Sequence, residues 1–132
     1  MLTDRCSFEL SKILKEHNFP QSSFEFFSDY YTESGDLIFN KEDAGPDLIF
    51  APLICEVLDR FDIDLNLNLS VYYNSNCKIQ YRVCDLTEGV EICKTLENED
   101  ILSRAYELCI LEAIKYYDSK VKKEVKNFED DR

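Results

Sequence analysis

The residues that could carry out catalysis are few, and their spacing does not favour it. His17 is the only histidine in the 132-residue sequence. A nucleophilic cysteine–histidine pair needs the two side chains within hydrogen-bond reach. Cys6 falls on the same side of a predicted helix as His17, but eleven helical residues separate the two by about 16 Å. We therefore interpret His17 as a half-buried structural histidine.

The six cysteines lie at positions 6, 55, 77, 84, 93 and 109. None forms a Cys-x-x-Cys pair, and none combines with a histidine at zinc-ligand spacing. The amino terminus lacks the basic start and apolar run of a secretory signal, so we expect a reducing compartment and free, structural thiols. An enzyme that depends on a thiol or a metal would require Cys77, Cys84 or Cys93 to meet His17 in a pocket.

The acidic clusters and the glycines also lack the spacing of a known site. One acidic cluster lies at the end of a predicted helix and another in the loop before it: Asp59, Asp62 and Asp64, then Glu42, Asp43 and Asp47. Neither has the glycine and distal glutamate of a calcium loop, so we interpret both as solvated surface. The three glycines are too scattered to cradle a phosphate. We predict no catalytic, cofactor-binding or metal-binding residues, and hence no enzymatic activity.

The charge of the chain is unevenly distributed. Its formal net charge is −12; residues 115–132 contain six basic and five acidic side chains, which leaves −13 on residues 1–114. An acidic body repels phosphate backbones, so direct nucleic-acid binding is not expected. The charge serves solubility or attracts a basic partner surface.

The clearest structural pattern is an alternation of apolar and polar residues from Asp64 to Cys84. Apolar residues take every second position on both sides of a short turn: Leu65, Leu67, Leu69, Val71 and Tyr73, then Cys77, Ile79, Tyr81 and Val83. A period of two with one apolar face predicts an antiparallel hairpin. Asn74-Ser75-Asn76 fits a three-residue turn, because asparagine tolerates a positive φ.

Helical periodicity and turn residues predict the other elements. We expect helices over Thr3–His17, from near Pro52 and after Asn98, and strands over Phe24–Tyr31 and Leu37–Phe39. Val90–Cys93 adds a further short strand. The order α-β-β-α-β-β-(β)-α predicts an α+β fold, with an antiparallel sheet of four to five strands and about three helices on one face. Residues 1–132 form one domain, and 118–132 are a helical extension or a frayed tail.

Exposed aromatic and apolar side chains suggest surfaces for a protein partner. Two groups stand out, one on strand faces and one beyond the core part of the last helix: Tyr72, Arg82, Phe27 and Tyr31, then Val121, Val125 and Phe128. The strand group forms a partner-binding patch or packs against another element of the chain. The helical group is a frayed helix end or a seam for a partner or a second copy.

Two segments carry a resemblance to a known group of sequences. They are Phe19-Pro20-Gln21 and Phe50-Ala51-Pro52-Leu53-Ile54-Cys55-Glu56-Val57-Leu58, followed by the hairpin and a closing apolar helix. The chain resembles small uncharacterised proteins of gut Bacteroidetes and their phages or prophages. Arg60-Phe61 stands where that group often has Trp-Leu. The resemblance implies a fold and an origin, and it supplies no catalytic residues.

Two functions remain open from the sequence. The first is a cytoplasmic, non-enzymatic accessory protein of a phage or mobile element, which acts through contact with a protein partner or with itself. The alternative is an acidic mimic of nucleic acid that blocks a basic protein surface. We expect no membrane association, because no stretch is long and apolar enough to span a bilayer.

Overall fold

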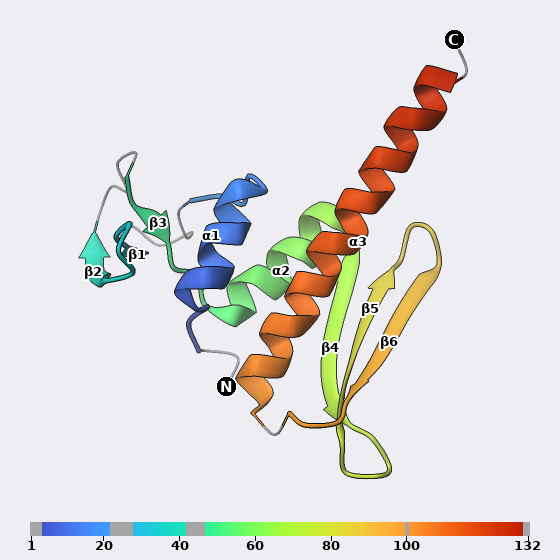
Figure 1. The fold of residues 1–132 in the computed structure, drawn as a ribbon, viewed down its shortest axis with the longest axis horizontal. Coiled ribbons are helices and arrows are strands. Elements are labelled where there is room, and N and C mark those ends of the chain that lie inside the picture. Colours follow the sequence, from blue (N-terminus) through green and yellow to red (C-terminus); the bar gives the residue numbers. More distant parts are fainter. Residues whose placement is uncertain (1–3, 22–27, 42–46, 100, 131–132) are drawn as a thin grey trace. The chain divides into compact units, whose positions relative to one another are not determined.

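The computed structural model describes residues 4–21, 28–41, 47–99 and 101–130, without the side chains of 40 and 124–130. This part of the chain is α+β, with the element order α1, β1, β2, β3, α2, β4, β5, β6, α3 (Figure 1). It divides into two compact units, Met1–Arg60 and Phe61–Arg132. The single domain predicted for residues 1–132 stays a prediction, and each unit is described by itself.

The first unit begins with helix α1, Phe8–Glu16. Ser7 caps it, and the Ser7 side chain accepts a hydrogen bond from the Leu10 N–H. The predicted start at Thr3 is wrong, because residues before the helix are extended: Cys6 N–H donates to the Pro52 carbonyl, and Arg5 forms a β-bridge with Leu53. At the other end Asn18 adopts a φ of 63°, which terminates the helix as its sequence predicts.

A small three-stranded sheet completes the first unit. It consists of β1 (Ser28–Tyr31), β2 (Leu37–Lys41) and β3 (Ile49–Phe50) in the order β2-β1-β3, and both pairings are antiparallel. Tyr30 and Phe50 are buried and pack ring against ring. The β1–β2 turn contains Gly35 at a φ of 92°, where a side chain would be strained and would press on the Phe8 ring.

Helix α2 spans Ile54–Leu65, which confirms the predicted start near Pro52 to within two residues. Asn66 follows it in the left-handed region, with a φ of 55°. This conformation reverses the chain direction directly into the second sheet.

The second sheet is regular and antiparallel. It consists of β4 (Leu67–Tyr73), β5 (Ile79–Asp85) and β6 (Val90–Leu96), with β5 in the centre. The alternation is confirmed on β5, where Ile79, Tyr81 and Val83 are buried. The predicted three-residue turn is wrong: Tyr73 pairs with Ile79, and Cys77 takes the positive φ of 59°.

Helix α3 runs from Leu102 to Asp130 and packs on β4 and β5. It starts three residues after the position predicted from an Asn98 cap. Its buried residues are Ala105, Cys109, Ile110, Ala113 and Ile114, and the Cys109 thiol lies against the carbonyls of Ser70 and Arg82 in the sheet. The helix continues past the end of the sheet through the predicted extension, shown in red in Figure 1.

The structure therefore confirms the α+β class and corrects the sheet. The predicted single sheet of four to five strands is wrong, because β1–β3 and β4–β6 form two separate three-stranded sheets. The extra strand β3 has only two residues, too few for a periodicity to reveal. The strand predicted at Val90–Cys93 is confirmed and extends to Leu96.

The core of the second unit makes a testable prediction about stability. Ile79 is 1% exposed in the central strand, so Ile79→Ala should lower the free energy of unfolding by about 2–5 kcal/mol, measured by urea denaturation. Ile63→Ala is the matched control, because Ile63 is 73% exposed and its loss should change stability by less than about 0.5 kcal/mol. Equal effects of the two substitutions would contradict this burial pattern.

Candidate functional site

The register of the second sheet gathers its polar residues on one face. Ser70 lies opposite Arg82, and Arg82 lies opposite Cys93, so polar positions align across all three strands. We call this set the polar face: Asn68, Ser70, Tyr72, Gln80, Arg82, Cys84, Glu91, Cys93 and Thr95. The opposite face carries the buried residues of β5 and packs on α3. Two predicted binding residues, Tyr72 and Arg82, therefore lie on the same face.

Tyr72 forms part of a cluster of side chains on the polar face. Its hydroxyl lies 3.5 Å from the Cys93 Sγ atom, and the Gln80 amide donates a hydrogen bond to the same sulfur. The hydrogen bond with Cys93 raises the pKa of the Tyr72 hydroxyl, and partial burial acts in the same direction. The phenol stays protonated at neutral pH, so it can donate a hydrogen bond.

Arg82 carries a positive charge on the polar face, and the carboxylate of Glu91 balances it. One guanidinium nitrogen lies 3.6 Å from a Glu91 carboxylate oxygen. The two side chains are 42% and 53% exposed, so the pair is in contact with solvent. A tyrosine and an arginine side by side are the residue types most common at the energetic centres of protein interfaces.

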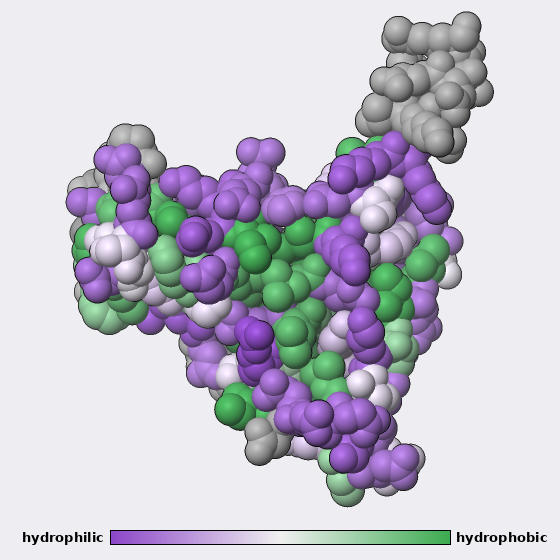
Figure 2. Space-filling view, viewed as in Figure 1, coloured by the Kyte–Doolittle hydropathy of each residue, from purple (hydrophilic) through white to green (hydrophobic). Residues whose placement is uncertain are grey.

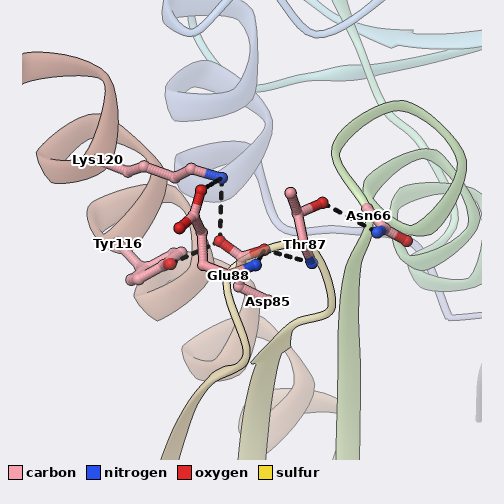
Figure 3. Close-up of polar contacts among 6 residues, drawn as sticks. All are labelled: Asn66, Asp85, Thr87, Glu88, Tyr116 and Lys120. Atoms are coloured by element: carbon pink, nitrogen blue, oxygen red, sulfur yellow. Dashed lines mark hydrogen bonds and ion pairs between the residues drawn. The ribbon is translucent and has the colours of Figure 1, made fainter. Parts of the chain in front are cut away.

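A buried carboxylate holds the end of this sheet (Figure 3). The Asp85 side chain is fully buried and accepts hydrogen bonds from the Tyr116 hydroxyl at 2.6 Å and the Lys120 ammonium at 3.1 Å. Its other oxygen accepts from the backbone N–H groups of Thr87 and Glu88. Asp85 thus joins the β5–β6 turn to helix α3.

The same turn is bound from a second side. The Asn66 side chain donates to the Thr87 hydroxyl at 3.0 Å, and the Leu86 N–H donates to the Asn66 carbonyl. Asn66 is the residue that ends α2. The β5–β6 turn is therefore held by the end of α2 and by two turns of α3.

The surroundings of Asp85 stabilise its ionised form. Burial alone would raise the pKa of this carboxyl, but hydrogen bonds from Tyr116, Lys120 and the turn backbone outweigh it and lower the pKa to about 2. Lys120 also lies 3.8 Å from Glu88, so one ammonium is shared by two carboxylates. Because the Asp85 side chain has no exposed surface, this arrangement is a structural link and not a place where substrate can bind.

The sequence interpretation missed Asp85, although a signal was present. Asp85 continues the buried phase of β5 after Ile79, Tyr81 and Val83. A carboxylate at an inward position must find donors, and Tyr116 and Lys120 stand four residues apart on one helix face. That combination could have been recognised from the spacing alone.

The residues weighed for catalysis lie in ordinary structural environments. His17 is exposed and caps α1, with its Nδ1 atom 2.8 Å from the Ile13 carbonyl, so the half-buried position predicted for it is wrong. None of the six cysteines forms a disulfide. Burial raises the pKa of Cys109 to about 12, and its thiol lies against the carbonyls of Ser70 and Arg82.

Acidic residues are not gathered for metal binding in the part of the chain that the structure describes. No three His, Cys, Asp or Glu residues within these ranges are arranged to hold a metal ion. Glu42 and Asp43 fall outside the described residues. Asp47 borders an open hollow of mixed charge in the first unit, where Lys15 donates to the Leu48 carbonyl.

The other predicted partner-binding residues are scattered or fall outside the description. Tyr31 lies in the first unit, where its hydroxyl donates to the Cys6 carbonyl at 2.8 Å and its ring packs on Phe8. Phe27 lies outside the described residues, as do the side chains of Val125 and Phe128. Val121 is half-buried on α3. Partner binding at these positions stays a prediction.

No family model matches the chain, and no match was found among curated proteins or solved structures. Across the described segments, no helix has the length and apolar character needed to cross a membrane.

The Asp85 link predicts a specific dependence of stability on pH. Because its pKa is lowered on folding, its ionic contribution is complete above a pH of about 4 and is lost as the pH falls towards about 2. Asp85→Asn should lower the free energy of unfolding at neutral pH by about 2–4 kcal/mol, since it breaks a buried pair with charge-assisted hydrogen bonds. Urea denaturation at several pH values measures both effects.

Two controls separate the charge of Asp85 from its shape. The difference in stability between the parent chain and Asp85→Asn should be constant above a pH of about 4 and shrink below it. Tyr116→Phe removes one donor but leaves the charge, so this variant should keep the pH dependence at lower overall stability. A difference that did not change between about pH 4 and pH 2 would contradict the ionised link.

Proposed function

We propose that this chain is a cytoplasmic, non-enzymatic accessory protein of a phage or mobile element that acts by binding another protein. One observation carries the proposal: the polar face presents Tyr72 and Arg82 on a sheet whose opposite face packs on α3. Tyr72 is 37% exposed and the Arg82 side chain 42% exposed, so both can reach a partner. Their neighbours Cys93 and Thr95 are exposed too.

Two further points support a binding role. His17, the only histidine, has a structural contact, since it caps α1. The assignment to a phage or mobile element rests on the resemblance carried by Phe19–Gln21 and Phe50–Leu58.

The acidic-mimic alternative draws its support from the charge of −13 on residues 1–114. A mimic needs unpaired carboxylates in rows, because it must imitate successive phosphates. On the second sheet several carboxylates instead lie beside cations, as in the pairs Arg82–Glu91, Lys78–Glu97 and Lys94–Glu112. This local balance of charge favours binding of a protein partner through shape and hydrogen bonds over mimicry of nucleic acid.

Affinity capture with matched variants tests the proposal. The immobilised full chain is exposed to lysate of a gut Bacteroidetes host, and retained proteins are identified by mass spectrometry. We expect a partner whose retention falls at least about tenfold with Tyr72→Ala and with Arg82→Ala, since interface centres of these types contribute 2 kcal/mol or more.

Tyr117→Ala provides the control for this experiment. Tyr117 is also 37% exposed but lies on α3, away from the polar face. The substitution removes an equal aromatic surface and should leave capture unchanged. Loss of the partner with Tyr117→Ala, or retention by all three variants, would argue against the polar face. A captured basic protein that nucleic acid displaces would favour the mimic instead.

A further inference from the structure

Strand β6 leaves one side of the second sheet open. It pairs with β5 along all seven residues, Val90–Leu96, and it is the last strand in the sheet order. Among the described residues, no backbone hydrogen bond outside that pairing reaches Val90–Leu96. An edge strand of this kind presents N–H and C=O groups that can pair with another strand.

The usual features that protect such an edge are weak here. Proteins blunt edges with bulges, prolines, very short strands or charged residues. The pairing of β6 with β5 is continuous, without a register shift, and the strand contains no proline. Its one lysine, Lys94, lies 3.7 Å from Glu112 on α3, so its charge is matched within the unit. The sheet of the first unit differs, since it has a shift in β1–β2 and a two-residue β3.

The α3 side of β6 is also incompletely covered. Val90 is 40% exposed, and Ile92 and Leu96 are half-buried, because α3 packs on β4 and β5. Figure 2 shows hydrophobic residues at the surface beside α3, over the strands of this sheet. A strand added at this edge would cover these side chains and satisfy the open backbone groups at once.

The sequence of β6 is complementary to itself in one register. In a dimer with a two-fold axis, residues that oppose each other across the seam must point to the same face of the joined sheet. The axis therefore passes between two copies of the same residue. With the axis at Cys93, Val90 meets Leu96 at both ends, Glu91 meets Thr95, and Ile92 meets Lys94. An axis at Lys94 would place lysine against lysine, and an axis at Ile92 would place Leu96 against Glu88. The Ile92 register also avoids like charges but joins apolar residues only at Ile92 itself, whereas the Cys93 register joins an apolar pair at each end of the strand.

The helices leave room for this pairing. Strands in a sheet lie about 4.8 Å apart, so the lines midway between β4 and β5 in the two copies would be about 19 Å apart. Packed helices need about 8–10 Å between their axes. Two α3 helices, each over its own β4 and β5, would therefore not collide.

We infer that β6 is the seam of a symmetric dimer, in which two second units form one six-stranded sheet of order β4-β5-β6-β6-β5-β4. The partner at this edge is a second copy of the chain, paired antiparallel about Cys93. The seam uses backbone groups at the edge of the sheet, whereas the proposed function uses Tyr72 and Arg82 on its face. Neither proposal depends on the other.

Opposite charges introduced at one position test the register. In the dimer Thr95 lies opposite Glu91 of the other copy, twice across the seam. Thr95→Glu creates two like-charge contacts and should weaken dimerisation by about tenfold, and Thr95→Lys creates two attractive contacts and should strengthen it. Sedimentation equilibrium of the full chain gives the dissociation constants, and thermal unfolding verifies that both variants are folded.

Thiol oxidation gives an independent test of the same seam. Directly opposed cysteines on paired strands lie within the range of a disulfide. Diamide should therefore take two electrons and two protons from the Cys93 thiols of two copies and join them. A disulfide-linked dimer is expected from the parent chain and from Cys77→Ser, the control at the other exposed cysteine, but not from Cys93→Ser.

The outcomes that overturn the inference are distinct. A chain that sediments as a monomer throughout, or charge variants that shift dimerisation equally or in the reverse order, would exclude this seam. A dimer that crosslinks through Cys77 and not through Cys93 would exclude it as well.

Discussion

The second unit depends on one constraint, the register of the central strand β5. This strand is hydrogen-bonded on both sides, and alternate residues are buried. A slip of one residue would bring Gln80, Arg82 and Cys84 beneath α3 and expose Ile79, Tyr81 and Val83. The apolar core therefore fixes the composition of the opposite face. The grouping of Tyr72 with Arg82 and Cys93 follows from packing on the other side of the sheet.

Asp85 is the point at which this alternation accepts a polar residue. It occupies a buried position of β5, where an unpaired carboxylate would be very unfavourable. Four donors compensate, two from the turn that follows it and two from α3. The buried charge thereby specifies how α3 is placed on the sheet, because only one placement of the helix brings Tyr116 and Lys120 to Asp85. Apolar contacts alone would tolerate a sliding helix more readily.

The sequence predicted those parts of the fold that follow from periodicity within a segment. The alternation over β4 and β5 and the apolar stripes of α1, α2 and α3 all correspond to observed elements.

The predicted ends of elements were less accurate where contacts with distant segments determine them. Thr3 and Ser7 are both good helix caps, and the choice depends on hydrogen bonds between residues 4–6 and 52–54. In the hairpin turn, Asn74 binds the N–H groups of Asn76 and Lys78, which leaves the positive φ to Cys77. Of the candidate site, the sequence placed Tyr72 and Arg82 together. Asp85 was missed, although its inward position on β5 and the four-residue spacing of its two helical donors, Tyr116 and Lys120, are visible in the sequence.

The charge distribution bears on how this chain would recognise a partner. Long-range attraction needs unbalanced charge, and it is screened beyond about 8 Å at physiological salt. The chain as a whole is strongly acidic, but Arg82 and Glu91 balance each other on the polar face. Binding there would rest on shape, aromatic surface and hydrogen bonds, so its affinity should depend weakly on salt. Binding through the acidic body would depend steeply on salt and would require a basic partner. The ionic-strength dependence of any complex therefore distinguishes a sheet-face interaction from nucleic-acid mimicry, even before the partner is identified.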